Sequence, residues 1–575
     1  MRQDLLRPFP EQDPADRRAG DAALDRLRAL LREWIDPAEV DELGRLPEGF
    51  LRALADAGLL KLTIDPALGG LGLSLVNAMR VVELAASWCT PVAFALAITN
   101  GFGSGSYLPV LPAGPLRDMI SARVTAGIVS AGADAEAIGT ANQRRATVAV
   151  PVEDGAAYLL TGEKVFIGNG PVADLMDVSA TVTAADGSDD VRLFFVDSRS
   201  PGFSVTARHE FMGLRGAAIG TLRLDAVRVP AEHMMDEQDG WRMRPNPSDV
   251  DDTEPTHRPD GGDLGWLAAV GRTMVIAPAA LALARRCLAW SRDFVSRRDI
   301  DGRNLGDYDE IQRLVAASAA DVFMIESIVT WCLLAQDRAD TLPDLTAAKN
   351  LASLACWRVV DRTMSLLGAE GYETALSKAR RGAPALPVER AFRDARALRI
   401  AGGVDFMLDL WSARSVLTSY DRAADAPGLD RSKIDSRTNA AGRDHLTFVS
   451  DHADDLAEVC RRLTRTVPPE ELFERQRTMI VLGQIGAELL SMSVVVARAA
   501  ELADQGSPSA LALADISCAA SRHRLAALWP QLTDQPDCAA TSQQWLHGSD
   551  LDFLMGDPPV DDPTPTIREG VPAHA

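Results

Sequence analysis

The sequence predicts a mainly α-helical protein with a central β domain. Apolar residues recur at three- and four-residue steps up to residue 125, alternate with polar residues from there to 243, and then return to the helical spacing. A chain of 575 residues with 47% hydrophobic content can form several cores. We expect the following segments: a helical N-terminal domain (1–125), a central β domain (126–243), an acidic linker (244–263), a helical bundle (264–420), an appended helical domain (440–550) and a disordered tail (557–575).

The N-terminal segment has helical periodicity at 21–36 and 46–60. Gly58 is suited to end the second of these helices, because glycine takes a left-handed conformation without steric cost. Glycine and proline interrupt residues 64–74 and predict a loop, and "LVNAMRVVELAASW" (75–88) predicts an apolar helix.

The β domain begins where the period of the pattern changes to two. "RATVAVPVEDGAAYLLTGEKVFIGNG" contains alternating strands, and its Asp154-Gly155 pair predicts a hairpin turn. The stretches 191–197 and 220–230 continue the alternation. We expect a compact sheet of about a hundred residues.

Two long helices of the bundle, within 274–298 and 310–336, are apolar over most of their circumference. Such helices are buried in a bundle core or against another subunit. A second polar stretch (421–444) separates them from the appended domain. There an apolar stripe is expected to pack within the protein rather than on a membrane or a partner: Met479, Leu482, Ile485, Leu489, Met492 and Val496.

Composition excludes several classes of function. Acidic residues outnumber basic ones by 81 to 59, so the net charge of -22 argues against nucleic-acid binding. The start of the chain has no apolar signal region, and no run approaches 18 apolar residues, so no transmembrane segment is expected. The seven cysteines and eight histidines are scattered without metal-ligand spacing. We expect no metal site and a reducing, cytoplasmic location.

Four motifs occur in order between residues 50 and 415. They are "GLLKLTIDPALGGLG" (58–72), "TGEKVFIGNGPVAD" (161–174), "GLRGAAIGTLRLDAVRVP" (213–230) and "LGAEGY" (367–372) followed by "VERAFRDAR" (388–396). Together they resemble the acyl-CoA dehydrogenase family. The block from 470 to 530, which includes "EELFERQRTMIVLGQIGAELLSMS", resembles the extra C-terminal domain of its very-long-chain branch.

The resemblance implies a helical N-terminal domain, a β-barrel-like middle domain and a C-terminal bundle. It implies FAD as cofactor, an acyl thioester of CoA or of a carrier protein as substrate, and a homo- or hetero-dimer. In this family a buried carboxylate removes the α-proton while the β-hydrogen leaves as hydride to the flavin. The chain should therefore carry such a base.

Both base positions of the family are glycine in this chain. Aligned on "VERAFRDARALRIAGGV", the usual catalytic glutamate falls on Gly402, and the alternative position, before Arg272, is Gly271. The Gly402-Gly403 pair could also be a simple helix C-cap. Glu370 and Asp405 are nearby candidates for a relocated carboxylate, although a solvated loop position explains either one as well.

The flavin positions are retained only in part. By resemblance, the cofactor-binding positions are Val129, Ser130, Phe166, Ile167, Gly168, Arg298, Gly302, Ser365 and Gly368. Phe166 replaces the aromatic, commonly Trp, that covers the flavin ring, and Arg298 matches an arginine that meets the diphosphate. Asp301 stands where the family has Phe, Ser365 where it has Gln, and Ala369 where it has Gly. "GFGSGS" (101–106) lacks the strand and lysine of a phosphate loop and predicts a turn.

Three functions fit these observations. The first is an FAD-dependent oxidoreductase acting on the CH–CH group of an acyl thioester, with its base unidentified. The second is a non-catalytic subunit whose partner in a hetero-oligomer supplies the base and flavin contacts. The third is a repurposed family member that catalyses flavin oxygenation or a non-redox reaction. A hydrolase is not supported, because the sequence contains no GxSxG motif.

Overall fold

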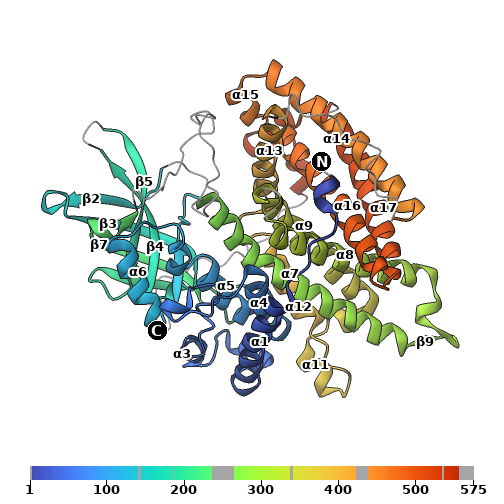
Figure 1. Cartoon of the computed structure of the whole chain (residues 1–575), viewed down its shortest axis with the longest axis horizontal. Helices are drawn as coiled ribbons and strands as arrows, with labels where there is room; N and C mark the ends of the chain where they lie inside the picture. The colour runs from blue at the N-terminus through green and yellow to red at the C-terminus, as the bar shows by residue number, and fades with distance from the viewer. Residues whose placement is uncertain are drawn as a thin grey trace.

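The structure is a computed structural model that describes residues 3–139, 144–184, 187–235, 264–336, 338, 341–422, 438–533 and 536–555. A sheet domain lies at one end of the molecule, a large helical body lies at the other, and the N-terminal helices lie along their border (Figure 1). The predicted fold class, mainly α with a central sheet domain and appended helices, is confirmed. The predicted linker at 244–263, most of the polar stretch 421–444 and the tail at 557–575 lie outside the described residues.

The N-terminal region consists of helices α1 (Pro14–Trp34), α2 (Pro37–Leu43), α3 (Phe50–Asp56), α4 (Leu75–Trp88), α5 (Thr90–Gly101) and α6 (Pro115–Thr125). Helix α1 begins seven residues before the periodic stretch at 21–36, because the Asp13 carboxylate accepts two backbone N–H bonds and Pro14 occupies the first turn. Gly58 follows α3 with φ +78°, as expected of a helix stop.

The sheet contains β1 (Ser130–Ala133), β2 (Val148–Val152), β3 (Ala157–Gly168), β4 (Leu175–Thr183), β5 (Asp189–Asp197), β6 (Phe203–Arg208), β7 (Ile219–Pro230) and β8 (Met234–Met235). Its strand order is β6-β7-β3-β2-β4-β5-β8, and β1 pairs in parallel with β4. The predicted hairpin joins β2 to β3, with Val152 opposite Ala157 and Asp154 and Gly155 at positive φ. One cluster of buried residues fills the sheet domain by itself, whereas another packs Leu175, Leu193 and Phe195 of the sheet against α6.

The bundle consists of α7 (Leu264–Ser296), α8 (Asp309–Leu334), α9 (Leu342–Leu367), α10 (Ala369–Tyr372), α11 (Ala375–Arg380), α12 (Val388–Leu398) and α13 (Asp405–Arg422). A short hairpin of β9 (Asp299–Ile300) and β10 (Arg303–Asn304) follows α7. Helix α7 packs on α9 inside the bundle and on α4 and α5 of the N-terminal region. It therefore extends along the border of the domains.

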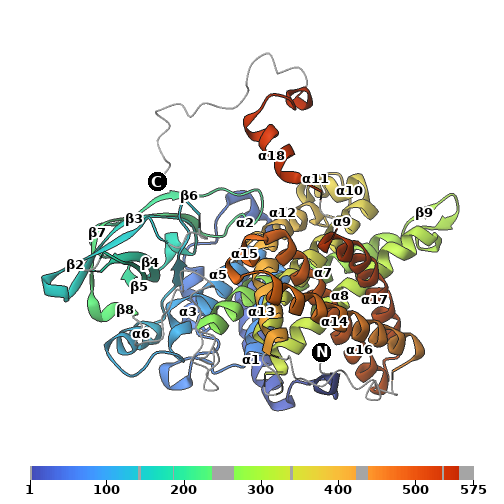
Figure 2. The same cartoon turned by 90° about the horizontal axis from the view of Figure 1, so that it is seen from above.

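The appended region contains α14 (Ala440–Thr466), α15 (Pro469–Glu474), α16 (Gln476–Asp504), α17 (Ser509–Leu528) and α18 (Cys538–His547). The stripe predicted to pack inside is buried, including Met479, Leu482 and Ile485 at 0% exposure. Ion pairs also join the regions, because Glu326 of α8 binds Arg285 of α7 at 3.0 Å and Arg498 of α16 at 2.9 Å. Helices α14, α16 and α17 lie against the bundle, whereas α18 projects away from it (Figure 2).

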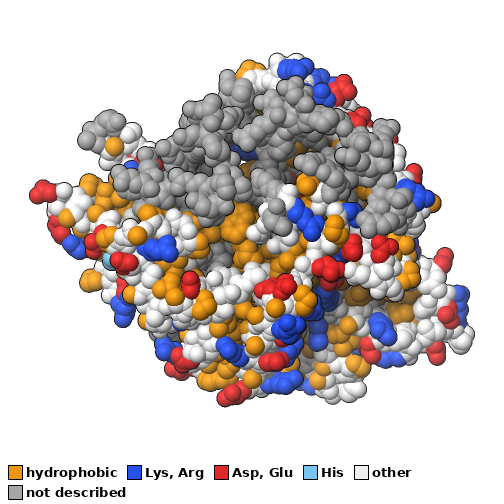
Figure 3. All heavy atoms as spheres, viewed as in Figure 1, with side chains coloured by type: hydrophobic (Ala, Val, Ile, Leu, Met, Phe, Trp, Pro, Cys, Tyr) orange, Lys and Arg blue, Asp and Glu red, His pale blue; other side chains and the backbone are white. Residues whose placement is uncertain are grey.

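Three helices are long and apolar enough to cross a membrane by length and composition alone: Trp266–Ser296, Asp309–Leu334 and Gln476–Asp504. Most of each apolar window is buried inside the protein, at 83%, 67% and 72%. This burial accounts for their apolar character. Acidic and basic side chains are interspersed on the surface seen in Figure 3.

Candidate functional site

The Asn-Gly pair of "TGEKVFIGNG" joins three elements at the border of the sheet domain and the helices. Asn169 follows β3, and its buried Nδ2 donates to the Ala95 carbonyl at 3.0 Å and the Thr99 hydroxyl at 3.2 Å, both on α5. The same amide reaches the Ser130 carbonyl on β1 at 3.5 Å. This bonding places the start of β1 and the end of β3 side by side against α5. Five predicted cofactor positions, Val129, Ser130, Phe166, Ile167 and Gly168, are thereby brought together.

Phe166 is exposed and held in an unfavourable backbone conformation. Its φ is +58°, its side chain is 63% exposed, and it lies where the β3–β7 register shifts between Lys164 and Ile167. His209 and Phe211 flank the ring, with centroids at 5.0 and 6.4 Å. A bulky residue at positive φ is strained, and strain of this kind is concentrated at functional sites. Phe166 therefore presents an aromatic face outside the core.

The other four residues of this group are less accessible. Ile167 and Ser130 are each 2% exposed and Val129 is 8% exposed, and the Val129 N–H donates to Asp174 at 2.9 Å. A Cβ at Gly168 would lie 2.5 Å from Cδ1 of Ile98, the movable end of a side chain on α5. Phe166 and the surface at Gly168 are thus the parts of this group most available to a ligand.

Two acidic residues in the loop after β1 form ion pairs with basic residues of the β domain. Glu136 binds Lys164 at 2.8 Å, and both side chains are almost fully buried. Asp134 binds Arg145 at 2.9 Å. Burial alone would raise the pKa of Glu136, but Lys164 and hydrogen bonds from Thr147 hold it below its usual value. Lys164 of the β-domain motif is therefore a structural residue, and no pattern in the sequence indicated that Glu136 is its partner.

The predicted turn "GFGSGS" is a point of close contact between elements. A Cβ at Gly103 would lie 2.3 Å from the Thr99 carbonyl oxygen and 2.6 Å from Cβ of Ser130. Gly101 and Gly271 touch through their backbones, so a Cβ at Gly271 would meet the Gly101 carbonyl oxygen at 2.5 Å and the Phe102 ring at 3.0 Å. The alternative base position is closed, because backbone atoms occupy the space of its side chain.

Gly402 differs from Gly271 in having space around it. A Cβ at Gly402 would make ordinary contacts with Arg272, 3.6 Å from its Cγ, and with Ile276, 3.9 Å from its Cγ1. Gly402 and Gly403 have φ values of +70° and +104°, which glycine adopts readily. The turn therefore has the conformation of the predicted C-cap and also leaves room for a Cβ beside Arg272.

Two cations lie against this glycine turn. Arg272 of α7 is partly buried, with its guanidinium 5.0 Å from the centre of the Trp411 ring on α13. Lys349 of α9 is buried and donates to the Gly403 carbonyl at 2.7 Å. Burial lowers the pKa of Arg272, and it lowers the pKa of Lys349 to about 8, with Arg272 adding to this effect and Asp405 opposing it.

Neither candidate for a relocated base is free. Asp405 forms an ion pair with Arg399, whose Nε lies 2.9 Å from its Oδ2. Glu370, on α10, lies 3.9 Å from Arg298, which follows the C-terminal end of α7. Arg272, by contrast, lies near the N-terminal end of that helix. Glu370 therefore belongs to a different region from Gly402.

The remaining predicted cofactor positions, Arg298, Gly302, Ser365 and Gly368, belong to that second region. Asp301 and Gly302 have φ values of +51° and +78° and form the two-residue turn between β9 and β10. Asp-Gly is a favoured pair for such a turn, which explains the aspartate at a position where the family has Phe. Arg298 is half-exposed and lies over the Phe294 ring at 5.2 Å.

One chain does not bring the two groups of cofactor positions together. Between Arg272 and the end of α7 at Ser296 the helix rises by roughly 36 Å, which exceeds the length of an extended dinucleotide. The strand β3 and the hairpin containing β9 lie at opposite ends of the molecule in Figure 1. Within one chain the nine predicted positions therefore fall into two separate groups.

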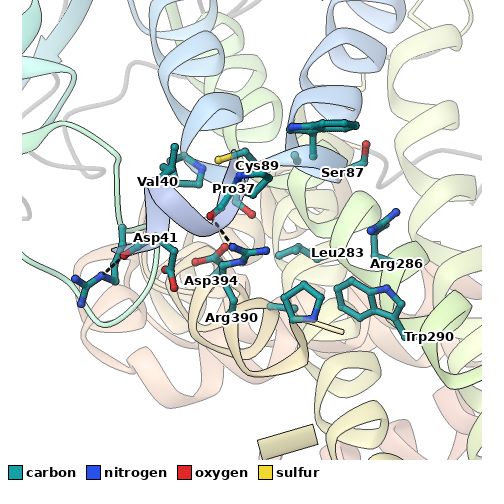
Figure 4. A pocket seen from close by; sticks show the side chains of 17 residues that line it. Pro37, Val40, Asp41, Ser87, Cys89, Leu283, Arg286, Trp290, Arg390 and Asp394 are labelled. Atoms are coloured by element: carbon teal, nitrogen blue, oxygen red, sulfur yellow. Dashed lines mark hydrogen bonds between the residues drawn. The ribbon is translucent and has the colours of Figure 1, made fainter. Parts of the chain in front are cut away.

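The "VERAFRDAR" motif has a structural role and borders a small cavity of about 60 Å³. The buried Asp394 carboxylate accepts the Leu214 N–H at 2.6 Å, and Arg393 binds both carboxylate oxygens of Asp41 at 2.7 and 2.9 Å. Figure 4 shows Arg390 and Asp394 projecting into this cavity from α12, with Trp290 on its other side. The motif joins the bundle to the loop before β7 and lies away from Gly402.

A buried carboxyl group that the sequence did not reveal lies beside β1. Asp177 on β4 accepts a 3.2 Å bond from the Tyr107 hydroxyl, and its Oδ1 has no hydrogen-bond partner among the described residues. Burial raises the pKa of Asp177 to about 8. The sequence also did not indicate that three residues meet beside the glycine turn. Arg272, Trp411 and Lys349 lie on three separate helices, and no sequence motif contains all of them.

Comparison with known proteins agrees with this architecture. Three models of the acyl-CoA dehydrogenase family match more than half of the chain: the N-terminal domain at 20–109, the middle domain at 130–227 and the C-terminal domain at 266–417. The probable acyl-CoA dehydrogenase FadE10 of Mycobacterium tuberculosis is 29% identical over 443 residues, which cover 76% of this chain and 64% of that protein. The chain thus spans less than two thirds of that relative's length.

Two further proteins are similar to this chain. The mitochondrial very long-chain specific acyl-CoA dehydrogenase of Bos taurus is 26% identical, covering 67% of this chain and 55% of that protein. The structure of an acyl-CoA dehydrogenase from Bacillus anthracis, complexed with FAD, has a TM-score of 0.73 at 17% identity and covers 93% of this chain and 91% of that one. With the family models and the fold in agreement, the chain belongs to the acyl-CoA dehydrogenase family.

Proposed function

We propose that this protein is an FAD-dependent oxidoreductase that acts on the CH–CH group of an acyl thioester of CoA or a carrier protein. The observation that carries the proposal is the exposed, strained Phe166 at the border of the sheet domain and the bundle. A chain keeps such a side chain out of its core when the ring has a ligand to contact. The FAD bound in the related acyl-CoA dehydrogenase structure supports the flavin ring as that ligand.

The residues present fit FAD as two half-sites. Phe166 and the surface at Gly168 would hold the ring. Arg298 would meet the diphosphate, and Gly302 and Gly368 leave open space beside it, since no atom lies within 4 Å of a Cβ built at either one. Bound FAD would accept a hydride. Since the half-sites lie at opposite ends of α7, we propose that two copies of this chain combine them in a dimer.

Mixing two defective chains tests this arrangement. Phe166→Ala and Arg298→Ala each damage one half-site, so each variant alone should retain little FAD. In a mixed dimer one site receives both wild-type residues, and about a quarter of all sites should regain FAD. Mixing the control variants Phe553→Ala and Arg313→Ala, both at exposed positions, should leave the flavin absorbance of either variant unchanged. No recovery in a mixture shown to contain mixed dimers would contradict the shared site.

A second candidate function is the non-catalytic subunit of a hetero-oligomer. It is favoured by the two glycines at the base positions, one of which, Gly271, is closed by the Gly101 backbone. The visible spectrum of the purified protein separates the two candidates. A flavin band at a stoichiometry near one per chain supports the dehydrogenase proposal. A colourless protein that acquires flavin only with a different partner chain supports the subunit.

A further inference from the structure

Arg272 is a guanidinium without a carboxylate partner. Its guanidinium lies over the Trp411 ring, the Asp134 carboxylate acts on it at long range, and Lys349 is a second cation nearby. Among the residues that the structure describes, Arg272 has no hydrogen bond or ion pair. Since it is partly buried, leaving its charge unpaired is costly. A nearby anion would remove that cost.

The carboxylates around Arg272 are already engaged by other groups. Asp134 binds Arg145, and Asp405 binds Arg399. The buried Asp409 accepts hydrogen bonds from Asn350 at 2.7 Å and Gln484 at 2.8 Å. Lys349 adds a second cation on the other side of the Gly402-Gly403 turn. Two cations therefore lie against the glycine turn, even though the whole chain carries a net charge of -22.

The space for an anion is the space that a side chain at Gly402 would take. A Cβ built there lies 3.6 and 3.8 Å from Cγ and Cβ of Arg272 and has no closer neighbour. A glutamate carboxylate begins only two carbon atoms beyond this Cβ, which itself lies in contact with the arginine side chain. The sequence has removed the carboxylate from this position and retained the cation beside it.

We propose that Arg272 binds a carboxylate supplied by a ligand in the space left by the missing side chain at Gly402. The carboxylate belongs either to a free acid or to the far end of a dicarboxylic acyl thioester. Where the proposed function holds, the bound carboxylate also acts as the base. The α-carbon C–H bond breaks, an O–H bond forms on the ligand carboxylate, and the electron pair remains on the substrate as a thioester enolate. Arg272 is then a positioning residue for this proton transfer.

Carboxylate binding can be measured without flavin or turnover. Acetate should bind to the full-length wild-type protein in calorimetry, and Arg272→Gln should weaken binding at least tenfold, about the value of a charge-assisted hydrogen bond. Arg313→Gln, which removes an exposed arginine of α8, is the matched control and should bind like wild type. Gly402→Glu should also lose acetate binding, because its own carboxylate fills the space. This variant keeps the test decisive if Arg272→Gln fails to fold.

Exchange of the substrate α-proton in D₂O distinguishes the two sources of carboxylate. With butyryl-CoA, exchange seen by NMR should require added acetate, whereas with glutaryl-CoA it should proceed without acetate if the substrate supplies the group. Equal acetate binding by wild type, Arg272→Gln and Gly402→Glu would overturn the proposal. Acetate binding that depends on Arg272, with no exchange from either thioester, supports the carboxylate site and contradicts the proposed function instead.

Discussion

Gly402 lies against the side chain of Arg272, and a Cβ at Gly402 would sit 3.6 Å from Cγ of that arginine. The other family base position, Gly271, lies one residue before Arg272 and is packed against the Gly101 backbone. The two glycines therefore have different structural roles. Gly271 is required by the contact between α5 and α7, whereas Gly402 leaves a cation facing an open position.

Gly271→Ala should destabilise the protein, although helix propensity alone predicts a gain of about 1 kcal/mol in mid-helix. The added Cβ would lie 2.5 Å from a backbone oxygen, so α5 and α7 must separate, at a cost of about 1–3 kcal/mol. Gly402→Asn is the control and should be nearly neutral, because Asn tolerates positive φ. Urea unfolding measures the free energy of unfolding of both variants. A Gly271→Ala variant that is more stable than wild type would show that the contact between α5 and α7 does not require glycine.

Phe166→Asn should separate stability from cofactor binding. Asn accepts the φ of +58° more easily, which relieves about 1 kcal/mol of strain, while the lost contacts with His209 and Phe211 cost a similar amount. We expect little change in the melting temperature of the flavin-free protein and at least a tenfold loss of FAD affinity. Phe166→Trp should retain affinity. Equal FAD affinity of Phe166→Asn and wild type would show that the Phe166 ring does not contact the cofactor.

Glu370→Gln should tighten FAD binding by up to about fivefold. The Glu370 carboxylate lies 3.9 Å from Arg298 and competes with the diphosphate for the same guanidinium, but both groups are partly exposed and the effect is screened. Glu373→Gln is a matched control, because Glu373 pairs with Arg381 at 2.7 Å instead. Fluorescence titration with FAD compares the three proteins, and weaker binding by Glu370→Gln would mean that this carboxylate assists the site.

Asp177 should make stability fall as pH rises. Its pKa is raised by burial from 3.8 to about 8, so between about pH 4 and pH 8 the folded protein retains a proton that the unfolded chain has lost. This group lowers the free energy of unfolding by about 1.4 kcal/mol per pH unit in that window, and its effect is constant above it. Asp177→Asn should remove this slope, while Asp225→Asn, at an exposed position of β7, should not. Parallel pH profiles of wild type and Asp177→Asn would exclude an unusual pKa at Asp177.

Much of the fold was predictable, because the spacing of apolar residues along a helix or strand indicates which of its faces is buried. The β2–β3 hairpin followed from Asp154-Gly155, and the burial of α16 followed from the Met479 stripe. The early start of α1 was missed, because Asp13 and Pro14 act through capping rather than through a repeating apolar pattern.

Positions of the candidate site could be predicted only where they lie within a sequence motif that the family shares. The empty position at Gly402 could be identified in this way, and so could Phe166. The Glu136–Lys164 pair joins residues 28 apart, and the Lys349–Gly403 contact joins residues 54 apart. Such contacts depend on how elements pack, which local patterns do not report. For the same reason the sequence did not reveal that its cofactor positions fall into two distant groups.

The most direct test of the missing base is the rate at which butyryl-CoA bleaches the bound flavin in a single anaerobic turnover, measured without added carboxylate for wild type and Gly402→Glu. The substitution places a carboxylate beside Arg272 at a backbone cost of about 1–2 kcal/mol, and general-base catalysis contributes about 10²–10⁴-fold. We predict slow bleaching in the wild-type protein and a gain of at least about 10²-fold in Gly402→Glu. Rapid bleaching by wild type, with no gain from Gly402→Glu, would contradict the account and show that the chain has a base elsewhere.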